Sequence, residues 1–320
     1  MKQIIWKLIS GIFILTATMG LSVAADYPSQ PITLIVPYGP GGGTDIIGRV
    51  ISQVLPTYTK TPVVVVNRPG ATGTVGTEDV KQAAADGYTM LLNDSGAMSV
   101  KPLTSKLPYS REDFSVVASI NETPFILTVA KDRPYKTMHE FVEYARENPD
   151  KVTFATAGIG SPFHIAMEEI ADVAGIKVKH IPAPGTGDAV TMVAGGHVDA
   201  VVSYPNAVLT QIEAGMIVPL GISSEGRTDQ LKDVPTFTES GVDYVGRGWK
   251  AIFVRSSVPE DRRKTLESAI FEMGKDPDFV SLMEKSGETV VVRSGAEFTK
   301  IWNDEFARFD KILKKTGMIK

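Results

Sequence analysis

Four glycines within five residues make one turn of this sequence well suited to binding a small anion. The turn follows the apolar run Ile32–Tyr38, and its glycines and the small polar residues after them are Gly39, Gly41, Gly42, Gly43, Thr44 and Asp45. Glycines allow left-handed backbone angles and bring main-chain N–H groups close to a ligand. A helix that starts after the turn, capped by Thr44 or Asp45, presents unpaired N–H groups and a partial positive charge. The pattern predicts the larger half of an anion site.

The turn matches neither of two better-known glycine motifs. A phosphate-binding P-loop has a lysine at the start of the helix, where this chain has Thr44 and Asp45. A dinucleotide fingerprint has a third glycine where Thr44 or Ile46 stands, and an acidic residue after the next strand, where this chain has Asn67. A tight strand-to-helix turn without any ligand is the alternative interpretation.

A second turn of the same kind lies halfway along the chain. Ala157, Gly158, Ile159 and Gly160 end the β-prone run that begins at Val152. Ser161 followed by Pro162 predicts a helix start, because serine caps the free N–H groups and proline lacks the N–H that would be free in the first turn. His164 lies one turn inside this helix. Each half of the chain therefore opens with a strand, a glycine turn and a helix N-terminus.

Alternating β-prone and helical stretches predict two parallel α/β sheets. The expected strands are Ile32–Tyr38, Val63–Asn67, Tyr88–Asn93, Val152–Ala157, Val178–Ile181, Val198–Ser203 and Ile217–Ile222. The expected helices are Asp45–Leu55, Thr74–Ala84, Met138–Arg146, Phe163–Val173, Asp188–Ala194 and Asn206–Ala214. Ligands of such sheets bind beyond the carboxyl ends of the strands. Further candidate contacts therefore follow strand ends, at Asn93, Ser95, Ser203 and Tyr204.

Two segments have the layout of crossovers between the halves. They are Thr123–Asp132 and Trp249–Arg255, each of which leads through a proline to a helix. We expect residues 26–124 plus 250–320 to form one lobe and residues 125–249 the other. The chain ends with apolar residues at helical spacing, from Phe298 to Leu313, which we expect to pack on the first lobe.

Residues 1–25 have the pattern of a cleaved secretory signal peptide. Lys2 and Lys7 precede an apolar run that ends at Leu21, and small residues follow it up to Ala25. No cysteine follows that could carry a lipid anchor, and no later apolar run approaches the length of a membrane span. We expect a free, exported protein.

The composition excludes several functional classes. The chain has 320 residues, 43% hydrophobic and 22% charged, which is enough for two domains. Its formal charge is −4, or −6 without Lys2 and Lys7, so no basic surface for nucleic acid is indicated. The chain has no cysteine, which excludes disulfides, thiolate nucleophiles and zinc–thiolate sites. His139, His180 and His197 lack metal-ligand spacing, and we expect neither a metal nor a cofactor.

No catalytic set is evident in the sequence. The chain has neither a Gly-x-Ser-x-Gly nucleophile turn nor a His-Glu-x-x-His motif. A secreted hydrolase that uses Ser161 with His164 is an alternative, but Ser161 has the features of a helix cap and nothing marks an acid that would orient the base. We expect no enzymatic activity.

An ordered series of short motifs resembles the Bug family, the periplasmic solute receptors of tripartite tricarboxylate transporters. The series includes Val36-Pro37-Tyr38, Gly42-Gly43-Thr44-Asp45, Val65-Val66-Asn67-Arg68-Pro69-Gly70, Ala85-Asp86-Gly87-Tyr88-Thr89, Gly158, Gly160-Ser161, His164 and Gly195-Gly196-His197-Val198-Asp199. The likeness covers essentially the whole chain after residue 25. It implies the fold of a type II periplasmic binding protein, with two α/β lobes, two crossover strands and a ligand cleft between the lobes.

The resemblance also implies a function and a site. A monomeric periplasmic receptor would capture a small carboxylate (a di- or tricarboxylate, an aromatic acid or an amino acid) and deliver it to a membrane permease of the tripartite tricarboxylate type. The main-chain amides of both glycine turns would hold the ligand, so the expected contacts are Tyr38, Gly39, Gly41–Asp45, Asn93, Ser95, Ala157–Ser161, His164, Gly185, Thr186, Ser203 and Tyr204. The family often has a lysine where this chain reads Ile181–Asp188, which leaves the contacts of Gly185 and Thr186 open. An extracytoplasmic sensing module is the other alternative.

Overall fold

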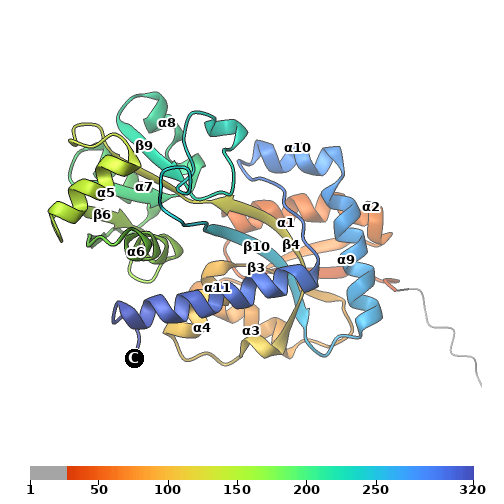
Figure 1. Cartoon of the computed structure of the whole chain (residues 1–320). Coiled ribbons are helices and arrows are strands. Elements are labelled where there is room, and N and C mark those ends of the chain that lie inside the picture. Colours follow the sequence, from red (N-terminus) through yellow and green to blue (C-terminus); the bar gives the residue numbers. More distant parts are fainter. Residues whose placement is uncertain (1–26) are drawn as a thin grey trace, which may run out of the picture.

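A computed structural model describes residues 27–320, which form two five-stranded sheets in two lobes (Figure 1). The sheet of the first lobe has the order β2-β1-β3-β10-β4. Its strands are β1 (Ile32–Val36), β2 (Val63–Asn67), β3 (Thr89–Asp94), β4 (Phe114–Pro124) and β10 (Arg247–Arg255). β1 pairs in parallel with β2 and β3, whereas β10 is antiparallel to both β3 and β4. The parallel arrangement predicted for the first three strands is confirmed, and β10 covers the segment Trp249–Arg255 that was predicted as a crossover.

The sheet of the second lobe repeats this arrangement, with the order β7-β6-β8-β5-β9. Its strands are β5 (Ile126–Ala130), β6 (Thr153–Thr156), β7 (Lys179–Pro182), β8 (Ala200–Ser203) and β9 (Ile217–Ile222). β6 is parallel to β7 and β8, and β5 is antiparallel to β8 and β9. In both sheets the antiparallel strands adjoin the connections between the lobes.

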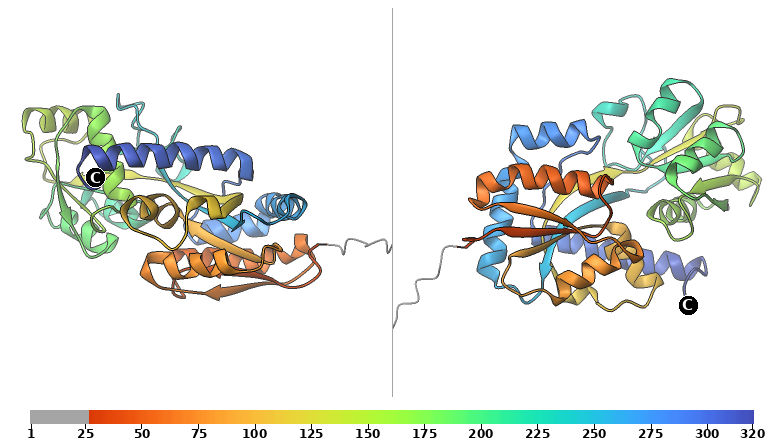
Figure 2. Two further views of the ribbon diagram at one scale, coloured as in Figure 1. Left: turned by 90° about the horizontal axis from the view of Figure 1, so that it is seen from below. Right: turned by 180° about the vertical axis from the view of Figure 1, so that it is seen from behind.

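Two crossover strands join the lobes. β4 passes directly into β5 with one residue, Phe125, between them, and β10 brings the chain back into the first sheet (Figure 2). β4 and β10 pair with each other over nearly their whole length. We call these two strands the hinge strands.

Helices cover both faces of each sheet. One face of the first sheet packs against α1 (Gly43–Val54), α2 (Pro56–Thr59), α9 (Glu260–Gly274) and α10 (Pro277–Lys285), and the other face against α3 (Thr74–Gln82), α4 (Lys101–Thr104) and α11 (Gly295–Lys315). One face of the second sheet packs against α5 (Met138–Glu147) and α6 (Pro162–Ala174). Its other face packs against α7 (Thr186–Ala194) and α8 (Leu209–Glu213). Short helical turns are η1 (Ala71–Gly73), η2 (Gly96–Val100), η3 (Arg111–Asp113), η4 (Pro205–Ala207) and η5 (Asp229–Leu231).

Three predicted features need correction or fall outside the described residues. α1 begins at Gly43 with Gly42 as its N-cap, so neither Thr44 nor Asp45 caps it. The helix predicted over Asn206–Ala214 is divided into η4 and α8. The predicted signal peptide lies outside residues 27–320. Within those residues, no helix combines the length and the apolar character needed to cross a bilayer.

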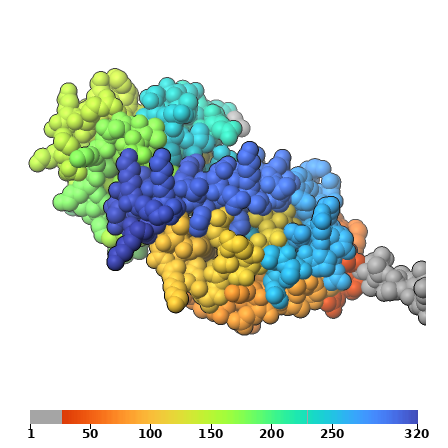
Figure 3. All heavy atoms as spheres, turned by 60° about the horizontal axis from the view of Figure 1, so that its bottom comes forward, coloured from red at the N-terminus to blue at the C-terminus, as the bar shows by residue number. Residues whose placement is uncertain are grey.

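The last helix, α11, lies across both lobes, whereas the sequence predicted packing on the first lobe (Figure 3). Phe298 and Trp302 join the core of the first lobe, as expected. About two to three turns after Trp302, Phe309, Ile312 and Leu313 pack with Val100 and with Ile165 of α6. Ion pairs from Lys315 to Asp172 and from Arg308 to Glu169 also reach α6. α11 is therefore a third connection between the lobes, besides the two hinge strands.

Glu305 of α11 is a buried carboxyl group between the two lobes and a hinge strand. It is 4% exposed and accepts hydrogen bonds from Ser99 Oγ (2.6 Å) and Trp249 Nε1 (3.0 Å). Burial raises the pKa of Glu305 from 4.5 to about 7, although these two hydrogen bonds oppose the shift. The folded state therefore binds the proton of the Glu305 carboxyl group more tightly than the unfolded chain does. The contribution of this protonation to folding stability is complete below pH 4.5 and is lost as the pH rises through 7.

Glu305→Gln is therefore expected to raise the melting temperature by several degrees at pH 8 and by little at pH 4.5. A glutamine keeps an acceptor for Ser99 and Trp249 but cannot ionise inside the protein. Thermal melts of both proteins from pH 4.5 to 8 test this, with the exposed Glu147→Gln as the control. A difference in melting temperature that does not change with pH would contradict it.

Candidate functional site

The first glycine turn leaves the amides at the start of α1 exposed. Gly42 is the N-cap with extended backbone angles (φ −75°, ψ 162°), and Gly41 adopts φ +83°, which favours glycine. A Cβ built on Gly39, Gly41 or Gly43 would meet no atom within 4 Å. The N–H groups of the first helical turn have no carbonyl one turn earlier to bond to. These unpaired N–H groups suit a negatively charged oxygen.

Asp45 supports this turn from inside the protein. Its carboxylate is 1% exposed, and it accepts hydrogen bonds from the Gly41 N–H (2.8 Å), Arg49 Nε (2.8 Å) and Asn67 Nδ2 (2.9 Å). Burial opposes ionisation, but these hydrogen bonds outweigh it and hold the pKa of Asp45 below its usual value. Asn67 also donates to the Tyr38 carbonyl (3.0 Å). Asp45 and Asn67 thus position the turn, and Asp45 has no free oxygen face directed at solvent.

Two of the predicted residues at the end of β3 are internal as well. Asn93 is fully buried and donates to Thr77 Oγ1 of α3 (2.9 Å), while its Oδ1 accepts from the Asp94 N–H (2.9 Å). Ser95 is 2% exposed. Asp94, which lies between them, is partly exposed. The strand-end pattern predicts Asn93 and Ser95 as contacts but not Asp94, which is the last residue of β3.

The second glycine turn has the helix start that the sequence predicts. Ser161 is the N-cap of α6, its Oγ accepts from the His164 N–H (3.2 Å), and Pro162 is the first helical residue. Gly158 (φ +92°) and Gly160 (φ +73°) both adopt left-handed angles. Ala157 and Gly158 are half-buried, and Ile159 is 72% exposed at the tip.

His164 holds this second turn in place through its ring. Nδ1 accepts from the Gly160 N–H (3.0 Å), and Nε2 lies 3.5 Å from Glu168 Oε1. The ring stacks on His180 at 3.8 Å, and burial together with the nearby His164 lowers the pKa of His180 to about 4. Because the ring nitrogens of His164 face Gly160 and Glu168, neither is directed at Ser161 Oγ as a hydrolase would require.

Internal hydrogen bonds occupy much of the second turn. The N–H groups of Gly158, Gly160 and Ser161 bond to Thr156, His164 and Gly158, respectively. Pro162 has no N–H. The first turn therefore has more main-chain donors left for a ligand than the second. The third predicted segment, Gly185 and Thr186, forms the half-buried start of α7 with Gly185 as N-cap.

Tyr204 extends from the second lobe onto a hinge strand. Its ring lies 5.8 Å from Phe125 and 4.9 Å from Phe163, centre to centre. Its hydroxyl fills the space over Gly248, where an added Cβ would lie 1.8 Å from the Tyr204 oxygen. Ser203 is fully buried, and its Oγ donates to the Tyr204 carbonyl (3.1 Å). Ser203 thus stabilises the end of β8 from inside, whereas the Tyr204 side chain that follows it is partly exposed.

Asp94 is the point at which the two lobes approach each other. A Cβ on Gly96 would lie 3.2 Å from Asp94 Oδ1 and 3.7 Å from Pro162 at the start of α6. The pKa values of Tyr38 on the first lobe and of Tyr204 on the second are both raised. Burial is the larger cause for each residue, and the charge of Asp94 is the next. Tyr38, Asp94, Tyr204 and the start of α6 therefore lie near one another where the two lobes meet, and we call this region the cleft.

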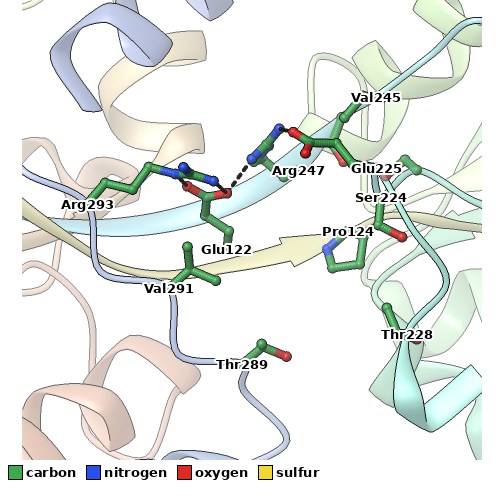
Figure 4. Close-up of a pocket in the computed structure, with 12 residues that line it drawn as sticks. Glu122, Pro124, Ser224, Glu225, Thr228, Val245, Arg247, Thr289, Val291 and Arg293 are labelled. Carbon is green, nitrogen blue, oxygen red and sulfur yellow. Dashed lines mark hydrogen bonds and ion pairs between the residues drawn. The ribbon is translucent and has the colours of Figure 1, made fainter. Parts of the chain in front are cut away.

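A separate cavity of about 230 Å³ lies beside the hinge strands (Figure 4). Arg247 contacts Glu122 and Glu225 there, and Arg293 Nε lies 2.6 Å from Glu122 Oε1. Burial opposes ionisation of Glu122, but Arg293 and Arg247 outweigh it and keep its pKa low. Arg247 is therefore engaged by carboxylates of the protein itself.

Comparisons with known proteins agree on one family. The model of the tripartite tricarboxylate transporter family receptor, TctC, matches residues 47–318. Protein BugT of Bordetella pertussis is 32% identical over 315 residues, covering 96% of each chain. A TctC solute binding protein from Polaromonas superposes with a TM-score of 0.84 at 28% identity, covering 90% of this chain and 99% of that one. R. palustris Rpa4515 with adipate has a TM-score of 0.73 at 26% identity, covering 91% and 99%.

These matches span nearly the whole described chain, and they agree with its two-lobed fold. The chain belongs to the TctC, or Bug, family of solute-binding receptors of tripartite tricarboxylate transporters.

Proposed function

We propose that this protein captures a small carboxylate between its lobes and delivers it to a membrane permease of the tripartite tricarboxylate type. The single observation that carries the proposal is that α1 in the first lobe and α6 in the second both begin directly after a glycine turn. Residues 26–124 plus 250–320 and residues 125–249 would be the two bodies that close on the ligand. The protein would work as an exported, monomeric receptor.

The energy of such binding is sufficient without a ligand-binding lysine or arginine. Micromolar affinity corresponds to about −8 kcal/mol. One helix terminus contributes roughly 0.3–2 kcal/mol, so two termini alone fall short. Each charge-assisted hydrogen bond adds about 1.5–3 kcal/mol, so roughly four to six donors would supply the affinity after binding costs. The first-turn amides of Gly43 and Thr44 are the first candidates, and the hydroxyls of Tyr38 and Tyr204 the next.

Two further facts support the proposal. The family is described as the receptor of a tripartite tricarboxylate transporter, and a structural relative at 26% identity is described with adipate, a dicarboxylate. Asp45, Asn67 and His164 act as positioning residues in this proposal, because their side chains bind the turns from behind.

Isothermal titration calorimetry against di- and tricarboxylates, aromatic acids and amino acids tests the proposed function. We expect at least one small carboxylate to bind with micromolar or better affinity and one-to-one stoichiometry. If no acid in the panel binds or raises the melting temperature, the receptor proposal fails.

A further inference from the structure

One face of the first sheet brings three charged side chains together at the cleft. Lys250 of β10 lies opposite Asp94 of β3 in the antiparallel register, so both side chains lie on the same face. Lys250 Nζ is 3.2 Å from Glu288 Oε1 in the loop between α10 and α11. Glu288 also accepts hydrogen bonds from Asn121 and Thr123 of β4. Lys250 and Glu288 are only 14% and 13% exposed, so this is a buried ion pair.

Asp94 remains without a cationic partner in this group. Its Oδ1 accepts from the Ala97 N–H (3.1 Å), and among residues 27–320 no basic side chain forms an ion pair with it. The Lys250 ammonium is engaged by Glu288. Two carboxylates and one ammonium leave this part of the cleft with one uncompensated negative charge.

Asp94 is also placed where a bound ligand would meet it. Its charge and that of Glu288 both act on the Tyr204 phenol, which lies over Gly248 on the same face of β10. A Cβ added to Gly96 would lie within 4 Å of both the Asp94 carboxylate and Pro162, the first residue of α6. A ligand carboxylate held at the start of α6 would therefore have Asp94 as a close neighbour.

We infer that the ligand carries an ammonium group as well as a carboxylate, and that Asp94 accepts the ammonium. The inference rests on the proposed function. The amides at the starts of α1 and α6 take the ligand carboxylate, and the ammonium balances the charge of Asp94. A ligand with carboxylates at both ends would instead place like charges side by side at Asp94, which is unfavourable in a partly buried site. The ligand class is thus an amino acid or another ammonium-bearing carboxylate.

Pairs of acids that differ only in the amine test this without any mutation. Calorimetry compares L-aspartate with succinate, L-glutamate with glutarate, and 4-aminobutanoate with butanoate. We expect the amine-bearing member of the best-binding pair to bind at least 10-fold more tightly. If the plain acid binds equally well or better, the inference is overturned while the receptor function stands. If these acids and every acid of the wider panel fail to bind, the proposed function itself fails.

Asp94→Asn is the matched protein variant. It should weaken binding of the amine-bearing acid at least 10-fold and leave the plain acid unchanged or tighter, with the fold checked by circular dichroism. Asp243→Asn, at an exposed position of the second lobe, removes the same charge away from the cleft and should change neither affinity. An unchanged ratio between the two acids in a folded Asp94→Asn protein would overturn the assignment of Asp94.

Discussion

Proline at position 43 is expected to lower the affinity for the carboxylate about 10- to 100-fold without unfolding the protein. Gly43 is the first residue of α1, where proline is well tolerated. Gly42 before it is already extended (ψ 162°), as the residue preceding a proline must be. The substitution therefore removes one N–H group and little else. One charge-assisted hydrogen bond is worth about 1.5–3 kcal/mol, which gives the expected loss.

Gly43→Ala is the control for this experiment. A Cβ at this position meets no atom within 4 Å, and alanine keeps the N–H. We expect Gly43→Ala to bind within about threefold of the unchanged protein, and both variants to melt near its temperature. Calorimetry with one ligand, chosen from the panel, measures all three proteins. Equal affinity of Gly43→Pro and Gly43→Ala would show that this amide is not a ligand donor, and would shift the site away from the first turn.

Local patterns in the sequence predict the second turn better than the first. Ser161 and Pro162 are adjacent, and their cap geometry depends on residues within one turn, so the start of α6 is as predicted. The role of Asp45 depends instead on Asn67, which is 22 positions away and belongs to another strand. This distant contact cannot be read from the local pattern, and α1 starts at Gly43, two residues before Asp45.

The same limit explains why Asp94 was missed. The sequence shows where β3 ends, but it does not show which residue at the end faces the cleft. Successive side chains of a strand point to opposite faces, so a shift of one residue decides whether a side chain faces the cleft. Asn93 donates a hydrogen bond to Thr77 of α3, whereas Asp94 lies on the opposite face of β3, in register with Lys250 of β10. The apolar face of α11 was likewise evident, whereas its contact with Ile165 depends on how the lobes pack together.

Alanine at position 248 is expected to lower ligand affinity at least 10-fold by displacing Tyr204. Its Cβ would lie 1.8 Å from the Tyr204 hydroxyl oxygen and 2.6 Å from the adjacent ring carbon. The whole end of the ring must move, which disturbs its contacts with Phe125 and Phe163. Overpacking of this kind costs about 1–3 kcal/mol of stability. The loss of affinity follows if Tyr204 belongs to the ligand site, and thermal melts with calorimetry measure both effects.

Gly246→Ala separates the loss of affinity from the loss of stability. Gly246 lies two residues before Gly248. An alanine there creates the same kind of steric conflict, because its Cβ would lie 2.2 Å from the Tyr244 hydroxyl. Tyr244 belongs to the core of the second lobe and donates to Glu169 Oε2 (3.1 Å), so its displacement leaves the proposed contacts in place. We expect both variants to melt at lower temperatures, but only Gly248→Ala to bind weakly. If both lose affinity equally, destabilisation alone explains the effect. If neither does, Tyr204 is not part of the ligand site, and ligand recognition on the second lobe must rest on the α6 turn.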